Sequence, residues 1–244
     1  MPYEKLIAKL KAVAGLSETN CAALTSMPYT AKILADGEYI LREGARASHC
    51  VIVEKGFLFR EKIVGSRAQI LSLHVAGDMP DLHTLHLPVM DHDLRSAGPS
   101  SVALVHHAAI SDMLTTLPWL THVFWRETLV DAAIFREWVA NLGSRDARSR
   151  VAHLFCELMA RLDILGLVQD DHFHLPFTQV SIADACGLST VHLNRIIQEL
   201  RQRGLIEWKA RTVTILQRKK LEELAEFSYD YLHQNDADRY SVRE

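Results

Sequence analysis

Residues 177–216 carry the pattern that most restricts what this chain can fold into, FTQVSIADACGLSTVHLNRIIQELRQRGLIEWKARTVTIL. Two short helical patterns are separated by Gly187, a residue that tolerates the positive φ of a tight turn. Ala183 on the first pattern is small enough to let a second helix approach, and Ser189 is a good N-cap for that helix. The segment therefore predicts a helix-turn-helix followed by a short β-wing.

The second of these helices has two chemically different faces. Its apolar residues fall at i, i+3, i+4 and i+7 and form one stripe for a core: Leu193, Ile196, Ile197 and Leu200. The other face predicts a recognition helix for a DNA major groove. Its candidates for contacts with bases are Thr190, Val191, Asn194, Arg195 and Gln198. The candidates for contacts with phosphates are Thr178, Gln179, Ser189, His192 and, at the wing tip, Lys209 and Arg211.

The distribution of charge agrees with a DNA-binding segment, although the net charge of the chain is −3. Residues 144–220 hold 12 Lys+Arg against 8 Asp+Glu, a balance of +4. Residues 1–143 hold 13 against 15, and residues 221–244 hold 2 against 7, so these two parts balance at −2 and −5. Positive charge is therefore concentrated where phosphates would bind, although a surplus of this size also arises by ordinary scatter.

The first 116 residues change from helical to strand-like periodicity. Residues 3–14 and 20–26 predict two helices. From about residue 31, short β-rich runs alternate with Gly37, Gly44, Gly56 and Gly65, and the run VALVHHAAI follows Pro99. This spacing predicts an antiparallel β-roll, with a short helix and loop over 82–92. The predicted fold class is therefore α+β, with an N-terminal β-roll and a C-terminal winged helix-turn-helix.

A long helix is predicted between these two parts, over residues 117–142, because the segment has no internal glycine or proline. It is apolar on more than one side, and Trp125, Ile134, Phe135 and Trp138 favour a dimer interface over a single-chain core. Gly143-Ser144 is a candidate hinge. The predicted domains are a sensor at 1–116, a dimerisation helix at 117–143, a DNA-binding domain at 144–220, and a C-terminal helix with an acidic, mobile tail at 221–244.

Several function classes are disfavoured by the sequence. The four cysteines are scattered and form neither a zinc motif nor a disulfide framework, and no run of about 18 apolar residues predicts a membrane span. No nucleophile–base pattern or phosphate-binding glycine loop indicates an enzyme. His83 and His86 lie at i and i+3 but lack an evident third ligand, so no metal site and no cofactor is predicted. A cytoplasmic location fits these features.

The order of parts resembles the Crp/Fnr family of bacterial transcription regulators over about residues 30–220. The stretches that carry the resemblance are ILREG (40–44), VEKGFLFR (53–60), AGD (76–78) and IADACGLSTVHLNRIIQELRQRGLI (182–206). The resemblance implies a cyclic-nucleotide-binding-like β-roll, a dimerisation helix and a DNA-reading domain that responds to a signal. It also implies that Arg195 contacts a guanine.

Departures from the family pattern affect the expected effector. Members that bind cyclic AMP have Gly-Glu where this chain has Asp81-Leu82, and Arg95-Ser96 matches their phosphate-binding Arg-Ser pair only with altered spacing. Asp81, Arg95 and Ser96 are therefore the candidate effector residues, with tight cyclic AMP binding not expected. Haem-binding members use an N-terminal proline and a histidine, and Pro2 and His74 match these only weakly.

The recognition helix departs as well, since Thr190-Val191 replaces the Arg-Glu of the best-known members and predicts a different target sequence. The sequence thus predicts a homodimeric, sequence-specific DNA-binding regulator of a palindromic operator, with an unidentified or absent effector and RNA polymerase as a candidate partner. The alternative is a small-molecule sensor that acts through protein contacts and has a vestigial DNA-binding domain.

Overall fold

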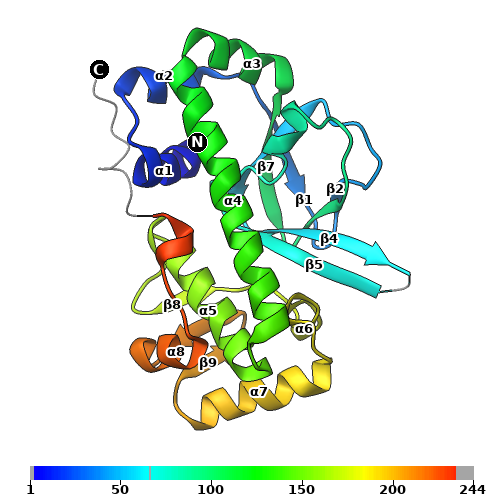
Figure 1. Cartoon of the computed structure of the whole chain (residues 1–244), viewed down its shortest axis with the longest axis vertical. Coiled ribbons are helices and arrows are strands. Elements are labelled where there is room, and N and C mark those ends of the chain that lie inside the picture. The colour runs from blue at the N-terminus through cyan, green and yellow to red at the C-terminus, as the bar shows by residue number, and fades with distance from the viewer. Residues whose placement is uncertain (1–2, 66, 235–244) are drawn as a thin grey trace. The chain divides into compact units, whose positions relative to one another are not determined.

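The computed structural model describes residues 3–65 and 67–234. The acidic stretch 235–244, predicted to be mobile, and Pro2 lie outside the described residues. Contacts divide the chain into two compact units (Figure 1). The sensor unit contains mainly residues up to Lys62 and Leu73–Ala133, and the C-terminal unit contains Ile63–Ser72 and Ile134–Leu232.

The sensor unit is a two-sheet β-roll with helices at both ends of its sequence. One sheet has the order β1-β7-β3 and the other the order β2-β6-β4-β5, and the registers that involve β7 and β6 are antiparallel. The strands are β1 (Thr30–Leu34), β2 (Tyr39–Leu41), β3 (His49–Lys55), β4 (Leu58–Val64), β5 (Arg67–His74), β6 (Asp93–Ser96) and β7 (Ser100–His106). The helices are α1 (Tyr3–Ala14), α2 (Glu18–Ser26), the 3-10 turn η1 (Leu82–Leu85) and α3 (His107–Thr116).

Two hydrophobic clusters hold the sensor unit together. The first lies inside the roll and includes the buried residues Val51, Val53, Leu58, Leu94 and Val102. The second joins α1, α2 and α3 to the outside of the roll, and its members include Leu6, Leu10, Ile52, Val105 and Leu120. Alternation along β3 and β7 makes both clusters possible, since neighbouring residues of a strand point to opposite faces.

The run VALVHHAAI is only partly a strand, which corrects its β-rich interpretation. Strand β7 ends at His106, and α3 begins at His107. The imidazole Nδ1 of His106 accepts a hydrogen bond from the backbone N–H of Ala108 at 3.2 Å, so His106 caps the new helix. A side chain that satisfies a free N–H at a helix start favours helix over continued strand.

Helix α4 (Pro118–Ser144) confirms the predicted long helix and extends it by two residues. Gly143 and Ser144 lie inside its last turn, so the helix does not break there as expected, and the hinge role of these residues stays a prediction. The chain leaves the helix at Arg145 and Asp146 instead. Asp146 Oδ1 accepts hydrogen bonds from the backbone N–H groups of Arg148 and Ser149, both at 2.9 Å, and so starts the next helix.

The C-terminal unit packs short elements around α5 (Ala147–Asp163), whose residues 151–162 are all buried. Its remaining helices are α6 (Gln179–Cys186), α7 (Thr190–Gln202), α8 (Arg218–Ala225) and the 3-10 turn η2 (Asp230–Leu232). A small antiparallel sheet of order β8-β10-β9 completes it, with β8 (His172–His174), β9 (Ile206–Lys209) and β10 (Thr212–Ile215). Helix α5 contacts α6, α7 and α8, so one buried helix supports the whole motif.

Candidate DNA interface

The turn between α6 and α7 is built as the sequence predicts. Thr178 caps α6 by accepting from the backbone N–H of Ser181 at 3.1 Å. Gly187 ends α6 with a φ of 61°, in the left-handed region. A Cβ at Gly187 would lie 3.1 Å from the Leu142 side chain as well as adopting a strained backbone, so glycine is required here for two reasons.

Helix α7 places its two faces in different environments. Ser189 accepts from the backbone N–H of His192 at 3.2 Å and starts the helix. The four residues of its apolar stripe, Leu193, Ile196, Ile197 and Leu200, are all buried, at 4 % exposure or less. The predicted amphipathic helix is therefore confirmed, and its outer face is left to solvent.

The outer face of α7 presents the residues predicted to contact bases. Val191, Arg195 and Gln198 are exposed, and Thr190 and Asn194 are partly exposed. Val191 keeps 64 % of its surface exposed, so its methyl groups are accessible to a ligand on this face. Arg195 makes neither an ion pair nor a hydrogen bond within residues 3–65 and 67–234. Its guanidinium is thus available for a ligand outside the chain.

The predicted phosphate-binding residues are also at the surface. Thr178, Gln179, Ser189 and His192 are exposed at the starts of α6 and α7. Backbone N–H groups at a helix start attract anions, and the helix dipole adds to this attraction. Both helix starts are therefore suitable for DNA phosphates.

The wing is a hairpin of β9 and β10 with an unusual turn. Lys209 pairs with Thr212 across the hairpin, which leaves Ala210 and Arg211 as a two-residue loop. Their φ values are 47° and 64°, the geometry of a type I′ turn that normally contains Asn-Gly. Arg211 is exposed, and Lys209 forms an ion pair with Glu207 of its own strand. Binding of Lys209 to a phosphate would therefore compete with Glu207.

A hollow of about 410 Å³ next to α7 contains a residue that sequence reasoning missed. It is lined by Asp146, Ala147, Arg148, His192, Arg195, Ile196 and Glu199. Arg148 lies in the first turn of α5 and pairs with Glu199 at 3.0 Å, and Glu199 also holds Arg203 at 2.7 Å. Arg148 is 47 residues from Arg195 in the sequence, so only the fold brings both to one hollow. The sequence signals only that Asp146 is suited to cap a helix, which places Arg148 in the first turn of α5.

The candidate effector residues have partners within the roll. Arg95 Nε donates to Glu61 Oε2 at 2.6 Å, and Glu61 also accepts from the Tyr39 hydroxyl at 2.7 Å. Ser96 is buried, donates to the carbonyl of Ala35 and accepts from the backbone N–H of Glu38 at 3.1 Å. A phosphate at Arg95 would have to displace Glu61.

Asp81 is committed to the backbone of the roll. It is fully buried, and its Oδ1 accepts from the backbone N–H of Val51 at 2.7 Å. Burial raises the pKa of Asp81 to about 7, and the hydrogen bond from Val51 opposes that rise. The group supports strand β3 rather than pointing toward a ribose, so its role in effector binding stays a prediction.

Several charged groups of the sensor unit are buried in pairs. Lys9 on α1 binds Asp78 at 2.7 Å and also Glu127 on α4, and all three side chains are largely buried. Burial alone would lower the pKa of Lys9, but the two carboxylates raise it overall. His74, considered for haem, is buried 3.5 Å from Asp78. Arg60 pairs with Asp131 at 3.0 Å and donates to the carbonyl of Pro80.

Comparisons with known proteins agree with this arrangement. Residues 149–224 match the model of the Crp-like helix-turn-helix domain. This match covers the helix-turn-helix part of the chain, and curated transcription regulators are similar to most of its length. It is 23 % identical over 195 residues to the transcriptional activator protein FnrA of Stutzerimonas stutzeri, a match that covers 80 % of each chain. Electron transport regulator A of Shewanella oneidensis is also 23 % identical over 195 residues, which is 80 % of this chain and 78 % of that protein.

Solved structures of the Crp/Fnr type share the fold. FixK2 from Bradyrhizobium japonicum superimposes with a TM-score of 0.74 at 22 % identity, over 83 % of this chain and all of that one. A CRP-family transcriptional regulator from Thermus thermophilus gives 0.66 at 20 % identity, over 81 % and 97 %. The β-roll, the long helix and the winged helix-turn-helix are thus the Crp/Fnr architecture, as the sequence resemblance implies.

Proposed function

We propose that this Crp/Fnr-type regulator binds a palindromic DNA operator as a homodimer and reads it with α7. The observation that carries the proposal is the outer face of α7, where Arg195 has no partner within the described chain and Val191 is exposed beside it. Arginine recognises guanine through two hydrogen bonds, and an aliphatic group contacts the thymine methyl. Thr190-Val191 gives this face a different specificity from an Arg-Glu pair.

The surrounding charges support binding to the DNA backbone. Residues 144–220 carry a balance of +4, from 12 basic and 8 acidic residues. Arg211 at the wing tip and the starts of α6 and α7 lie at the surface of the same unit. Contacts of this kind set orientation and strengthen binding without reading sequence.

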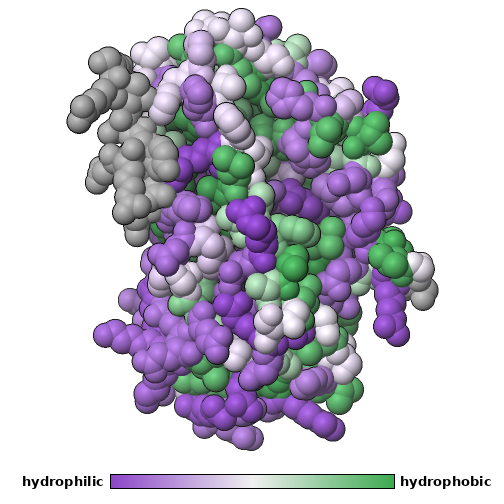
Figure 2. Space-filling view, viewed as in Figure 1, coloured by the Kyte–Doolittle hydropathy of each residue, from purple (hydrophilic) through white to green (hydrophobic). Residues whose placement is uncertain are grey.

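The proposed dimer uses the exposed face of α4, with residues that differ from those first expected. Ile134 and Trp138 are buried in their own chain at 7 % and 5 % exposure, and Trp138 donates to Glu157 at 3.1 Å. These two were wrong as seam residues. The exposed apolar residues of α4 are Trp125 (62 %), Leu129 (54 %), Phe135 (40 %) and Val139 (56 %). Hydrophobic residues are exposed among hydrophilic ones on the face of the molecule that carries α4 (Figure 2).

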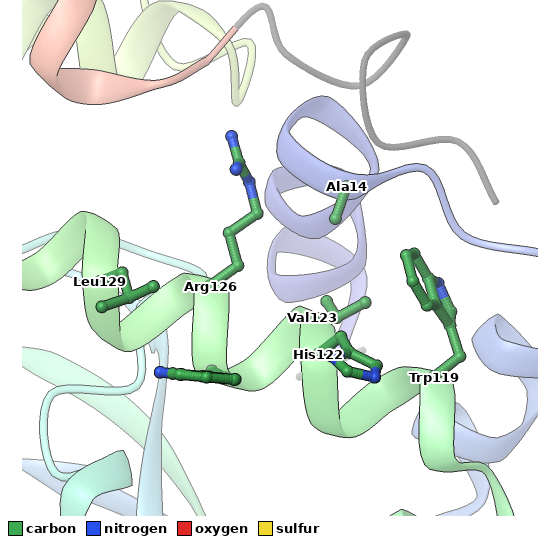
Figure 3. Close-up of a pocket in the computed structure, with 7 residues that line it drawn as sticks. Ala14, Trp119, His122, Val123, Arg126 and Leu129 are labelled. Atoms are coloured by element: carbon green, nitrogen blue, oxygen red, sulfur yellow. The ribbon is translucent and has the colours of Figure 1, made fainter.

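A hollow of about 350 Å³ adjoins the start of this stripe. Trp119, Val123 and Arg126 lie on the side of α4 that faces Ala14 at the end of α1 (Figure 3). Arg126 Nε donates to the carbonyl of Val13 at 2.9 Å, and its side chain forms one wall of the hollow. A partner's α4 side chains would fill an apolar surface of this kind, since stable dimer interfaces resemble a domain core cut in half.

The DNA proposal is tested by fluorescence anisotropy with double-stranded genomic fragments over a range of salt concentrations. The wild-type protein should bind, with an affinity that falls steeply with salt. The double variant Lys209→Ala/Arg211→Ala should flatten the salt slope by about 2 units, because each of the two side chains is expected to neutralise one phosphate. The control, Lys11→Ala/Lys55→Ala, removes the same charge from the sensor unit and should keep the slope. Absence of salt-dependent binding in the wild type would favour the vestigial-domain alternative.

The dimer proposal is tested by sedimentation of Leu129→Glu and Val139→Glu. Either change places a charge in the proposed seam without touching the core of its own chain, and it should give folded monomers. Thr115→Glu adds the same charge at an exposed position on α3, outside the proposed seam, and should leave the dimer intact. Intact dimers in both seam variants would contradict the assignment.

Two further expectations from the resemblance stay proposals. Cyclic AMP should not bind in the low-micromolar range, because Glu61 holds Arg95 and Leu82 offers no acceptor for a ribose hydroxyl. RNA polymerase is the partner expected of a transcription regulator of this type. No helix in the described part of the chain is long and apolar enough to cross a membrane.

A further inference from the structure

Three groups that bind metal ions well meet between η1 and the segment before β6. His83 lies on η1, and Asp91 and His92 immediately precede β6. One ligand atom of each lies within 4.8 Å of the other two. The centroids of the two imidazole rings are 5.4 Å apart, with 44° between their planes. Ligand bonds of about 2.0–2.2 Å would require only small side-chain rotations from this arrangement.

Both histidines have a buried nitrogen without a hydrogen-bond partner. His92 is 5 % exposed, and its Nδ1 is 2.5 Å from Asp91 Oδ1. Its Nε2 is inaccessible and finds no partner among residues 3–65 and 67–234, and the same holds for Nε2 of His83. Buried polar atoms are nearly always paired, so two unpaired imidazole nitrogens in one cluster are available for a ligand.

The chemistry of the two rings suits a metal ligand. A neutral imidazole has one nitrogen with a free lone pair, and both His83 and His92 keep one ring nitrogen without a hydrogen-bond partner in the described chain. The carboxylate of Asp91 lies 2.5 Å from Nδ1 of His92 and so belongs to the same cluster.

The positive charge near the cluster is already balanced. Arg60 is the cation that acts on both histidines, and it is paired with Asp131 at 3.0 Å. Asp91 then supplies a negative charge for a bound cation, and its side chain is 83 % exposed, which gives an entry path from solvent. The neighbouring His86 is exposed and is not part of the cluster, so the i, i+3 pairing of His83 with His86 does not form the site.

We propose that His83, His92 and Asp91 bind one divalent first-row transition metal ion. Imidazole nitrogen suits zinc, iron, nickel and copper, whereas magnesium and calcium prefer oxygen ligands. Three protein ligands leave at least one coordination position for water, so the ion exchanges and responds to its concentration. Metal binding would fix η1 to the segment before β6 within the sensor unit. The site is independent of the DNA interface and goes beyond the proposed function.

The test uses the full chain without an affinity tag, stripped of metal with a chelator. Titration with Co²⁺ should give visible d–d absorption that saturates at one equivalent per chain, and Zn²⁺ should abolish that absorption. Mg²⁺ should not compete. Zn²⁺ should also raise the Tm of the wild-type protein, because an ion that binds only the folded state stabilises it.

Variants locate the ion. His83→Gln and Asp91→Asn should each weaken Zn²⁺ binding at least about tenfold, and the Zn²⁺-dependent rise in Tm should be lost in His83→Gln. His83 is only partly buried, and the Tm in chelator shows that each variant is folded. The matched controls, His86→Gln and Cys21→Ser, should bind as the wild type does. The proposal is overturned if the wild type shows no saturable binding, if His83→Gln binds equally well, or if His86→Gln loses binding.

Discussion

The two compact units differ in how particular basic side chains are used. In the sensor unit, Lys9, Arg60 and Arg95 are each paired with buried or half-buried carboxylates. The C-terminal unit also buries one such pair, Arg161 with Glu157 at 3.1 Å, but its Arg195 and Arg211 reach solvent without an ion pair in the described chain. The paired cations therefore stabilise the fold, whereas Arg195 and Arg211 are left for an external ligand. Replacing one of the paired cations in the sensor unit should therefore lower the free energy of unfolding, whereas replacing Arg195 or Arg211 should weaken DNA binding.

The largest effect is expected from Lys9→Met. The change removes the cation between Asp78 and Glu127 and leaves two carboxylates buried together. Loss of one partner from a buried ion pair costs about 3–5 kcal/mol, so the free energy of unfolding should fall by that amount. Urea denaturation measures it. Lys11→Met, on the exposed side of the same helix, should change stability by less than about 0.5 kcal/mol. Equal effects of the two changes would show that the buried cluster does not stabilise the unit.

The counterpart in the C-terminal unit is Arg195→Ala. Stability should stay within about 0.5 kcal/mol of the wild type, because this side chain has no partner within the described residues. Discrimination between operator and scrambled DNA should fall by about 1–3 kcal/mol, the contribution of one bidentate contact to a base. Anisotropy competition at fixed salt measures the ratio. The control Arg203→Ala breaks only the ion pair with Glu199 and should leave the ratio of operator to scrambled-DNA affinity unchanged. An unchanged ratio in Arg195→Ala would show that Arg195 does not contact bases.

The same contrast explains what could be predicted from the sequence. The helix-turn-helix depends on local signals, such as the Ser189 cap and Gly187, which act within a few residues. The long helix was predictable from its unbroken apolar pattern. The side of this helix that forms the proposed seam was not predictable. Ile134 and Trp138 are buried in their own chain, Trp138 with a hydrogen bond to Glu157 of α5, and one apolar side of a helix looks like another in a sequence.

The ion pairs of the sensor unit could not be predicted from a local sequence pattern. Lys9 and Glu127 are 118 residues apart, and Arg60 and Asp131 are 71 apart. The cluster proposed to bind a metal ion has no local signature for a similar reason, since eight residues separate His83 from His92. A helical spacing draws attention to His86 instead. Residues whose partners are set by strand order become evident only when the sheet topology is known.

Asp81 provides a pH test of the sensor unit. Its pKa is about 7 in the folded chain, raised by burial, against an ordinary value near 3.8. Between these values the folded state holds a proton that the unfolded chain has lost, so this group makes stability fall as pH rises from about 4 to 7. Asp81→Asn keeps an acceptor for the Val51 N–H and removes the ionisation. The stability of the variant relative to the wild type should therefore rise by about 2–3 kcal/mol between pH 5 and pH 8.

Buried histidines act in the opposite direction and must be separated from Asp81. Burial lowers the pKa of His74 and that of His153, the latter to about 3. As pH falls below about 6.5, the unfolded chain binds protons on these histidines that the folded chain does not, so the folded protein loses stability. The difference between Asp81→Asn and wild type at each pH cancels these shared terms. Thermal unfolding from pH 5 to 8 measures the difference. A difference that does not change with pH would show that Asp81 is ionised throughout.

The smallest effect is expected at the wing, where the turn that presents Arg211 holds Ala210 in an unfavourable backbone conformation. Ala210 has a φ of 47° in the type I′ turn, a conformation that costs an L-residue with a Cβ about 1 kcal/mol unless its side chain suits the turn. Asparagine adopts this conformation readily, so Ala210→Asn should raise the free energy of unfolding by about 0.5–1 kcal/mol. Ala140→Asn, on the exposed side of α4, should lower it slightly through helix propensity. The midpoint of urea denaturation distinguishes the two signs, and the DNA salt slope should stay unchanged because Lys209 and Arg211 are retained. Destabilisation by Ala210→Asn would mean that the wing turn is not of type I′, and that Arg211 is presented by some other geometry.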